Sequence, residues 1–458
     1  MFENSNIVVT GGTGSFGHAF VPKTLEKYNP KKIIIFSRDE MKQWEMAKLY
    51  RGDPRIRFFI GDVRDRERLY RAFRNVDYVV HAAATKIVPT AEYNPFECVK
   101  TNINGAMNVI DAAVDCHVKR VVALSTDKAS SPINLYGATK LASDKLFVAS
   151  NSYGGEHGTR YAVVRYGNVM GSRGSVIPFF MSIKDKGEFP ITDARMTRFM
   201  ISLDDGVKLV WHAFEDMEGG EIYVKKIPSM KITDIAASIS QSAVQKIVGI
   251  RPGEKLHEQM IGEEDAPHTY EYPEHFKILP AINNWSSSPA RIKDGLKVPD
   301  GFTYSSDNNA EWMTREELKA WSKIPTRWMD DDIYGHVNNV VYYSYFDTAV
   351  NGNLIRATGQ DIRSQDAIGI VVESGCTFHR ELSFPQVIEA GLLVEKIGKS
   401  SVTYRVGLFI EEESEPAASG HFVHVYVDRE NRRPVRVPEN IRQALRPIML
   451  EDLSLIHI

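Results

Sequence analysis

The chain has 458 residues, which suggests two or three domains because a typical domain has about 150 residues. Its composition, 43% hydrophobic and 25% charged, is that of an ordinary globular protein and argues against a disordered chain. Lys and Arg (56) nearly balance Asp and Glu (59), and a formal net charge of −3 argues against a protein that coats nucleic acid. Three widely separated cysteines and the absence of a signal peptide or a long apolar run predict a soluble protein of the reducing cytoplasm.

The first third of the sequence alternates short apolar runs with longer amphipathic stretches. Because these runs are apolar at every position, both of their faces should be covered, as in a parallel sheet with crossover helices. The pattern predicts a Rossmann-like, doubly wound α/β domain with a small substrate subdomain. The five expected strands are residues 6–10, 32–36, 57–60, 77–80 and 120–124.

From about residue 324 the pattern changes to long strands without helix-sized connections, which favours an antiparallel sheet and a second domain. The expected strands are residues 368–376, 386–394, 401–410 and 420–427. Residues 312–323 look helical and run into this domain without a linker, which leaves open a natural fusion or the joining of two unrelated reading frames. The last six residues, 453–458, resemble the translation of a transposon end used in preparing sequencing libraries, and we expect a non-native tail.

A glycine-rich segment, TGGTGSFG at residues 10–17, follows the first strand and opens a helix. Gly11 permits a tight turn, Gly14 lets the backbone approach a pyrophosphate, and Gly17 allows close packing of helix and strand. The helix start supplies N–H groups and a positive dipole for the phosphates. The segment predicts a dinucleotide site that includes Thr13, Ser15 and Phe16, against the alternative of a plain glycine-rich turn.

The end of the second expected strand indicates which dinucleotide is bound. An NAD enzyme usually has an acidic residue there for the ribose 2′-hydroxyl, whereas this chain reads Ser37-Arg38-Asp39 with Lys42 one helical turn later. Two cations favour binding of the 2′-phosphate of NADP. Two alternatives remain: Asp39 could bind the ribose of NAD, or the two cations could be solvent-exposed residues at the start of a helix. Along the adenine and ribose we expect residues that follow the third and fourth strands, namely Asp62, Val63, Ala82 and Ala83.

A group of reactive side chains follows the fifth expected strand. Thr126, Asp127 and Lys128 come directly after it, and Tyr136 and Lys140 follow with a four-residue spacing that places both on one helix face. An ammonium beside a phenol lowers the phenol pKa from its usual value of about 10. We therefore expect a tyrosinate that takes a hydroxyl proton while hydride leaves the same carbon.

Residues 1–322 resemble the extended short-chain dehydrogenases/reductases, and among them the inverting UDP-N-acetylglucosamine 4,6-dehydratases that begin pseudaminic acid and related surface-glycan synthesis. The segments that carry the resemblance are TGGTGSFG, FSRDE, GDVRD, AEYNPFE, STDKA, YGATK, VRYGNVMGSRGSVIPFF and RPGEKLHE. The resemblance implies that Tyr136, with Thr126 and Lys140, draws the C4 hydroxyl proton while hydride passes to NADP⁺. It further implies that Asp127 protonates the departing C6 hydroxyl and that Lys128 handles the C5 proton.

Lys128 distinguishes this site, because retaining sugar-nucleotide dehydratases and their relatives typically have Glu beside the Asp. A lysine is a base only if its pKa falls below the usual value of about 10.4, so we predict a desolvated ammonium beside Lys86 or Lys140. The alternative is an ion pair between Asp127 and Lys128.

The resemblance also suggests residues that contact the substrate, UDP-N-acetylglucosamine. Two arginines suit a diphosphate because each offers a planar fork of donors, although any one of them could instead form a surface ion pair. Lys86 would lie near the sugar. The candidates for uracil, diphosphate and ribose are Asn168, Arg173, Arg251 and Glu254.

Residues 324–449 resemble a hotdog-fold acyl-CoA thioesterase of the 4-hydroxybenzoyl-CoA thioesterase type, through TRWMDDDIYGHVNN and YYSYFD. The resemblance implies that Asp332 attacks the thioester of an acyl-CoA or activates water, with helix-start N–H groups polarising the carbonyl. An acidic turn that only caps a helix remains the alternative. In this fold the active site usually forms between two subunits, so we expect a homo-oligomer.

Several functions therefore remain open from the sequence. Within the first module the rivals to an inverting dehydratase are a sugar-nucleotide epimerase, a retaining 4,6-dehydratase and a noncatalytic NADP-binding regulator. For the second module the rival to a thioesterase is an element that only dimerises the protein.

Overall fold

The computed structural model describes most of the chain in two compact units, Met1–Trp321 and Ser322–Ile458, which we call the N-terminal and C-terminal units. In the part of the chain that is described, we find no helix with the length and apolar character needed to cross a membrane. The described residues are 1–50, 52–153, 158–170, 175–184, 187–240, 242–315, 318, 337, 339–358, 365–382, 386, 388–410 and 415–449.

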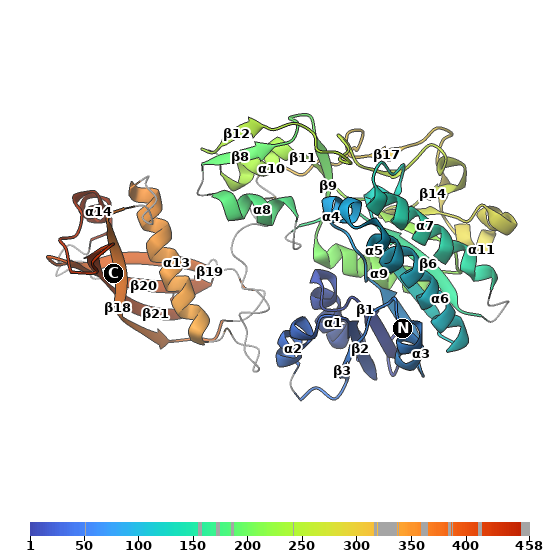
Figure 1. The fold of residues 1–458 in the computed structure, drawn as a ribbon, viewed down its shortest axis with the longest axis horizontal. Helices are drawn as coiled ribbons and strands as arrows, with labels where there is room; N and C mark the ends of the chain where they lie inside the picture. The colour runs from blue at the N-terminus through green and yellow to red at the C-terminus, as the bar shows by residue number, and fades with distance from the viewer. Residues whose placement is uncertain are drawn as a thin grey trace. The chain divides into compact units, whose positions relative to one another are not determined.

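A twisted ten-stranded sheet forms the centre of the N-terminal unit, in the order β16-β14-β15-β10-β6-β5-β4-β1-β2-β3 (Figure 1). Seven neighbouring strands from β3 to β10 are parallel, and β14, β15 and β16 continue the sheet antiparallel at one edge. The parallel, doubly wound sheet is thus confirmed. The parallel strands are β1 (Asn6–Thr10), β2 (Lys32–Ser37), β3 (Ile56–Ile60), β4 (Tyr78–His81), β5 (Arg120–Leu124), β6 (Arg160–Arg165) and β10 (Ile222–Lys225); the others are β14 (Thr269–Glu271), β15 (His275–Ile278) and β16 (Leu296–Lys297).

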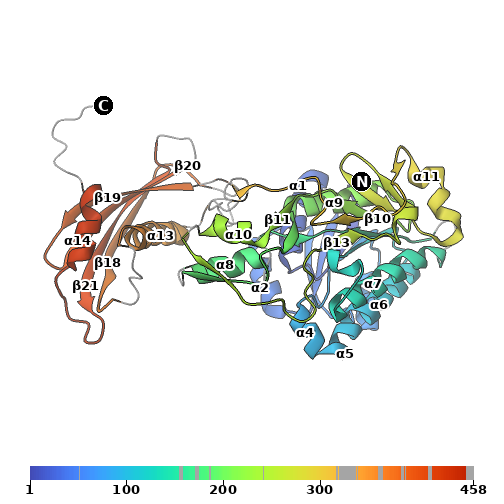
Figure 2. The same cartoon turned by 90° about the horizontal axis from the view of Figure 1, so that it is seen from above.

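Helices cover both faces of this sheet, as parallel strands require. α6 and α7 lie side by side, and α1 packs against α9 (Figures 1 and 2). Side chains at the helix starts satisfy the first backbone N–H groups: Asp39 caps α2 and Asn134 caps α7. The helices are α1 (Ser15–Tyr28), α2 (Glu40–Leu49), α3 (Arg66–Ala72), α4 (Val88–Tyr93), α5 (Pro95–Val99), α6 (Gly105–Asp115), α7 (Leu135–Ala149) and α9 (Leu203–Asp216).

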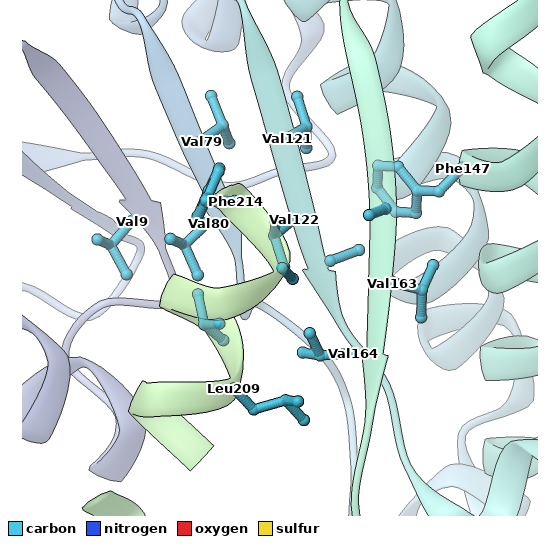
Figure 3. Close-up of a cluster of buried hydrophobic side chains, with 14 of the residues drawn as sticks. Val9, Val79, Val80, Val121, Val122, Phe147, Val163, Val164, Leu209 and Phe214 are labelled. Carbon is cyan, nitrogen blue, oxygen red and sulfur yellow. The ribbon is translucent and has the colours of Figure 1, made fainter. Parts of the chain in front are cut away.

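The core of the N-terminal unit lies along the central strands. Fully buried valines of β1, β4, β5 and β6 pack between α9, which contributes Leu209 and Phe214, and α7, which contributes Phe147 (Figure 3). Burial on both faces explains why these strands read as continuous apolar runs. The packed sheet fixes the ends of the strands, from which the functional loops emerge.

A smaller subdomain of the same unit has its own apolar core, which includes Phe180, Phe189 and Met200. Its sheets are short, with orders β11-β9-β7, β12-β8 and β13-β17. Its elements are β7 (Asn168–Val169), β8 (Glu188–Ile191), β9 (Thr197–Ile201), β11 (Ser229–Lys231), β12 (Val244–Ile247), β13 (Gln259–Ile261), β17 (Tyr304–Ser305), α8 (Val176–Ile183) and α10 (Ile232–Ile239), and α11 (Pro289–Ile292) follows β15.

The C-terminal unit is a four-stranded antiparallel sheet, in the order β18-β21-β20-β19, with the long helix α13 packed against one face (Figure 1). Alternate residues of β20, among them Val402, Tyr404 and Val406, are buried, as expected of a sheet that one helix covers. This arrangement confirms the expected hotdog-type α+β fold. The elements are α13 (Asn339–Thr358), β18 (Ala367–Phe378), β19 (Ile388–Ile397), β20 (Ser401–Ile410), β21 (Ala418–Asp428) and α14 (Glu439–Leu445).

Candidate active site

A cavity of about 930 Å³ lies in the N-terminal unit where the parallel strands end. Its wall begins at the glycine-rich turn after β1, continues past Thr126 and Tyr136, and ends at the segment 251–258 of the subdomain. Loops from the ends of neighbouring parallel strands meet at one edge of a sheet, which explains why residues so far apart in sequence share this wall.

The glycine-rich turn is shaped by close backbone contacts. Gly11 has a φ of +65°, and a Cβ there would lie 2.8 Å from Cα of Ala83. A Cβ on Gly17 would collide with the carbonyl oxygen of Gly12, so Gly17 serves helix packing and is not in the cavity wall. No side-chain hydrogen bond caps α1 at Gly14, which leaves the positive end of the helix available to an anion. This cradle fits the pyrophosphate of a dinucleotide.

The basic pair after β2 lies on the cavity wall. The Arg38 side chain is 65% exposed, and its guanidinium is 3.8 Å from the carboxylate of Asp62. The Asp39 carboxylate instead accepts a hydrogen bond from the backbone N–H of Lys42 (3.0 Å) and pairs with its Nζ (2.7 Å), which holds the pKa of Asp39 below its usual range. Asp39 is therefore occupied in capping α2, whereas Arg38 is open to the cavity.

Other expected cofactor residues are also in the wall. The Thr13 and Ser37 hydroxyls share a hydrogen bond of 2.8 Å, which ties the glycine turn to the end of β2. His81, the first residue of the His81–Ala84 segment expected along the adenine and ribose, bonds through Nδ1 to the Thr10 hydroxyl (2.9 Å) and braces the loop after β4. Burial and the charge of Lys140 lower the pKa of His81 to about 3, so its ring is neutral. The remaining members of the predicted set in the wall are Ser15, Phe16, Lys42, Asp62, Val63, Ala82, Ala83 and Lys140.

The reactive side chains meet because α7 lies directly on the turn 127–129. A Cβ on Gly137 would collide with the carbonyl oxygen of Lys128, so only glycine permits this approach. Thr126, Lys128 and Tyr136 face the cavity, whereas Asp127 lies behind them with 1% of its side chain exposed. The structure thus brings the predicted group together around one part of the cavity.

The charge that acts on Tyr136 differs from the expected one. Burial raises the pKa of Tyr136 to about 12, and the positive charge of Lys128 and a hydrogen bond with Thr126 offset part of this rise. The prediction of a lowered phenol pKa, and so of a tyrosinate near neutral pH, is therefore wrong for the free protein, because burial outweighs the nearby positive charge. Burial lowers the pKa of Lys140 itself, and the carboxylate of Asp144 acts against this lowering.

Lys128 lies between two carboxylates, and its Nζ is 3.1 Å from Oδ1 of Asp127 and 3.1 Å from Oε1 of Glu258. Burial disfavours the ammonium, but the two carboxylates outweigh burial and raise the pKa of Lys128 above its usual value. The predicted lowering of this pKa beside Lys86 or Lys140 is wrong, because the carboxylates of Asp127 and Glu258 raise it. The alternative ion pair with Asp127 is present.

Asp127 has the properties of a group that holds a proton. Burial raises the pKa of its carboxyl group, and the charge of Lys128 offsets this only in part. Its Oδ1 accepts a hydrogen bond from the Thr126 hydroxyl (2.9 Å), and within the described residues Oδ2 has no hydrogen-bond partner. A neutral carboxylic acid here would be a donor for a leaving hydroxyl.

Sequence reasoning missed the role of the subdomain segment that closes this part of the cavity. The Asn134 side chain donates to the carbonyl oxygen of Gly253 (2.8 Å), and Lys255 Nζ donates to that of Ser130 (2.7 Å). These bonds hold Glu258 against Lys128. Glu258 is the last letter of the quoted segment RPGEKLHE, so the motif contained the residue but gave no sign of its partner.

Four of the five residues expected to contact the substrate are in the cavity wall. Lys86, Asn168, Arg251 and Glu254 line the cavity, and Arg251 pairs with Glu254 at 2.7 Å while its side chain remains 68% exposed. Arg173, and Asp332 of the C-terminal unit, lie outside the described residues.

Comparisons with known proteins find relatives of both parts of the chain. A family model described as polysaccharide biosynthesis protein matches residues 7–280, and one described as thioesterase-like superfamily matches residues 326–445. A Campylobacter jejuni protein named UDP-N-acetylglucosamine 4,6-dehydratase (inverting) is 58% identical over 325 residues, which cover 69% of this chain and 97% of that protein. A Rickettsia akari protein named UDP-glucose 4-epimerase is 43% identical over 327 residues, 70% of this chain and 95% of that protein.

A solved structure extends the similarity to three dimensions. The X-ray structure of Pen from Bacillus thuringiensis matches with a TM-score of 0.65 and 36% identity, covering 70% of this chain and 98% of that one. Because the first family model spans more than half of the sequence, the chain belongs to the polysaccharide biosynthesis protein family, and its resemblance to the inverting UDP-N-acetylglucosamine 4,6-dehydratases is confirmed.

Proposed function

We propose that residues 1–322 convert UDP-N-acetylglucosamine to the UDP-4-keto-6-deoxy sugar with inversion at C5. The observation that carries this proposal is the placement of Lys128 between Asp127 and Glu258, on the same cavity as Tyr136 and the glycine-rich turn. The 58% identity to a protein named for this activity supports it, since the relative named as an epimerase is 15 percentage points lower (58 − 43).

The side chains supply the acids and bases that such a reaction needs. A bound nicotinamide would accept hydride from C4 and return it at C6. Tyr136 takes the C4 hydroxyl proton, and the resulting ketone acidifies the hydrogen on C5. Lys128 then takes the C5 proton while Asp127 protonates the leaving C6 hydroxyl, so that water is lost across C5 and C6. After hydride returns at C6, Lys128 gives a proton back to C5, and its addition to the opposite face of the ring sets the inverted configuration.

One incubation tests this proposal. The protein is mixed with UDP-N-acetylglucosamine and NADP⁺, and the sugar is followed by NMR. The expected product has lost water and has the inverted configuration at C5. An epimerase would retain the C6 hydroxyl, a retaining dehydratase would keep the C5 configuration, and a noncatalytic regulator would leave the substrate unchanged.

NADP is the proposed cofactor, because Arg38 is open to the cavity while the Asp39 carboxylate is occupied in capping α2. We expect Arg38→Ala to weaken NADP⁺ binding about 10-fold to 100-fold, which is the effect of losing charge-assisted hydrogen bonds to a phosphate. NAD⁺ binding should change little, since NAD lacks that phosphate. Isothermal titration calorimetry with both dinucleotides measures the difference; an equal loss for both would contradict the assignment.

For residues 324–449 we propose an acyl-CoA thioesterase that works as part of a homo-oligomer. The thioesterase-like match and the helix packed on an antiparallel sheet support the hydrolase. Apolar side chains on the edge strand β18, among them Val371, Val372 and Phe378, are exposed in the single chain, which supports pairing with a second copy.

Asp332→Asn tests the thioesterase proposal. The variant is expected to lose hydrolysis of a panel of acyl-CoA thioesters by at least about 100-fold, because an amide is neither a nucleophile nor a base. Released CoA is measured with a thiol reagent. Asp428→Asn, which changes a carboxylate at the end of β21, is the control. If the unaltered protein hydrolyses no thioester but still forms oligomers, the module only dimerises the chain.

A further inference from the structure

Glu258 is a buried carboxylate that has no role in the reaction steps proposed for Tyr136, Lys128 and Asp127. It directly precedes β13, lines the cavity, and has 2% of its side chain exposed. Its Oε1 is 3.1 Å from Nζ of Lys128 and 3.7 Å from Nε of Arg198. Its Oε2 has no hydrogen-bond partner within the described part of the chain. Burying a carboxylate is costly even when it is paired, and here one of its oxygens has no hydrogen-bond partner, so its position needs an explanation.

Backbone contacts hold this carboxylate rigidly. The Glu258 N–H donates to the Ser306 hydroxyl (2.9 Å), and the Ser306 N–H donates to the Glu258 carbonyl oxygen (2.8 Å). The Arg198 guanidinium donates to the carbonyl oxygens of Thr197 (2.7 Å), Leu256 (3.2 Å) and Lys255 (3.1 Å). Glu258 and Arg198 therefore form a fixed ion pair at the base of the cavity.

The two carboxylates that flank Lys128 differ in their surroundings. Burial raises the pKa of Asp127, and Lys128 is the cation that offsets this. Burial also acts on Glu258, but the charges of Lys128, Arg198 and Lys255 outweigh it and lower the pKa of Glu258. Glu258 lies near two cations, Lys128 at 3.1 Å and Arg198 at 3.7 Å, whereas Asp127 is paired with Lys128 at 3.1 Å, so the second cation disfavours protonation of Glu258 and favours Asp127 as the acceptor of a proton that leaves Lys128.

We infer that Glu258 is a positioning residue that holds the Lys128 side chain toward the substrate, so that Lys128 exchanges its proton with Asp127. The inference rests on the proposed dehydratase function. A proton passes from Lys128 Nζ to the Asp127 carboxylate, which gives a neutral amine and a neutral acid in one step. The amine then takes the C5 proton, and the acid gives its proton to the C6 hydroxyl, which leaves as water. The ammonium and the carboxylate are thereby restored.

This arrangement keeps the charge of the site constant. Glu258 is balanced by Arg198, so moving one proton between Lys128 and Asp127 changes no net charge in the buried cluster. Among the described residues, Tyr136 and Lys255 also interact with this cluster, and the proposed transfer leaves the protonation of both unchanged. A change of net charge is unfavourable in a site of low dielectric constant. Proton transfer between Lys128 and Asp127 is therefore favoured over uptake of a proton from solvent.

Glu258→Gln tests the inference because the amide keeps the shape of the side chain and removes its charge. Lys128 is followed by NMR in protein with ¹³C-labelled lysine, and its signal is identified by its absence in Lys128→Ala. We expect the Lys128 titration midpoint to fall by at least about one pH unit. The kcat for UDP-N-acetylglucosamine should fall at least about 10-fold with little change in KM, because the substrate still binds but the amine is misplaced.

Glu221→Gln is the matched control, since Glu221 is 1% exposed and 3.6 Å from an arginine, Arg291, but is not in the cavity wall. It should leave the Lys128 midpoint and the ratio of kcat to KM unchanged. Arg198→Gln should shift the midpoint in the opposite direction, upward, because a like charge is removed from Lys128. This variant keeps the inference testable if Glu258→Gln does not fold.

An unchanged Lys128 midpoint in Glu258→Gln, or a downward shift in Arg198→Gln, would overturn the inference. A Lys128 midpoint in the unaltered protein at or below that of free lysine would do the same. These NMR readouts need no turnover, so they are separate from the proposed function. If the unaltered protein releases no dehydrated sugar, the proposed function fails even where the titrations follow the expected pattern.

Discussion

Lys128→Ala is expected to reduce the dehydration of UDP-N-acetylglucosamine by about 10²-fold to 10⁴-fold, the range of effects seen when a positioned acid or base is removed. The ammonium lies 3.1 Å from both Asp127 and Glu258, so its removal eliminates the group that we propose handles the C5 proton and leaves two carboxylates near each other. Cofactor binding should persist, because the glycine-rich turn and Arg38 lie at other parts of the wall.

The decisive measurement is exchange at C5 in deuterated water. The unaltered protein should incorporate deuterium at C5, whereas Lys128→Ala should not, although NADP⁺ still binds by calorimetry. Lys208→Ala, which changes an exposed lysine of α9, is the control and should behave as the unaltered protein. Deuterium incorporation at the normal rate in Lys128→Ala would contradict the role of Lys128.

Much of the architecture follows from local sequence patterns. The strands at residues 6–10 and 120–124 were predicted at their observed bounds, and the other three early strands differ by one residue at one or both ends. This agreement arises because strands buried on both faces need apolar residues at every position, a pattern that local sequence reveals. In the C-terminal unit the strand at 401–410 also agrees, whereas β18 extends to Phe378 and β19 begins at Ile388.

The electrostatics of the site could not be predicted in this way. The four-residue spacing of Tyr136 and Lys140 predicts that both lie on one face of a helix. It does not predict which charged side chains from other parts of the chain lie near that face. Glu258 is 130 residues after Lys128 (258 − 128), and the contact depends on how the subdomain is tied to α7 through Asn134 and Gly253. The sequence therefore predicted side chains that the structure places together, while their protonation depends on tertiary contacts.

Tyr136→Phe is expected to reduce turnover by about 10²-fold to 10⁴-fold, because it removes the hydroxyl that takes the C4 proton. Substrate and cofactor binding should change little, since the ring that packs beside Leu135 and Ala91 is kept. Stopped-flow absorbance of the reduced nicotinamide measures the affected step. Formation of reduced nicotinamide at the normal rate in Tyr136→Phe would contradict this role, and a defect confined to a later step would point to Lys128 or Asp127 instead.

Because the pKa of Tyr136 is shifted, Tyr136→Phe should also change how the reaction rate and the stability depend on pH. Burial raises the pKa from its usual value of about 10 to about 12, so at neutral pH the phenol is protonated in the free protein. The rate of hydride transfer should therefore rise with pH in the unaltered protein, and this dependence should disappear in Tyr136→Phe. A folded-state pKa above the unfolded one also means that the stability contributed by the phenol is present below pH 10 and is lost as the pH rises to about 12. Denaturant unfolding across this interval should show a steeper loss of stability for the unaltered protein than for Tyr136→Phe, because phenylalanine has no proton to lose.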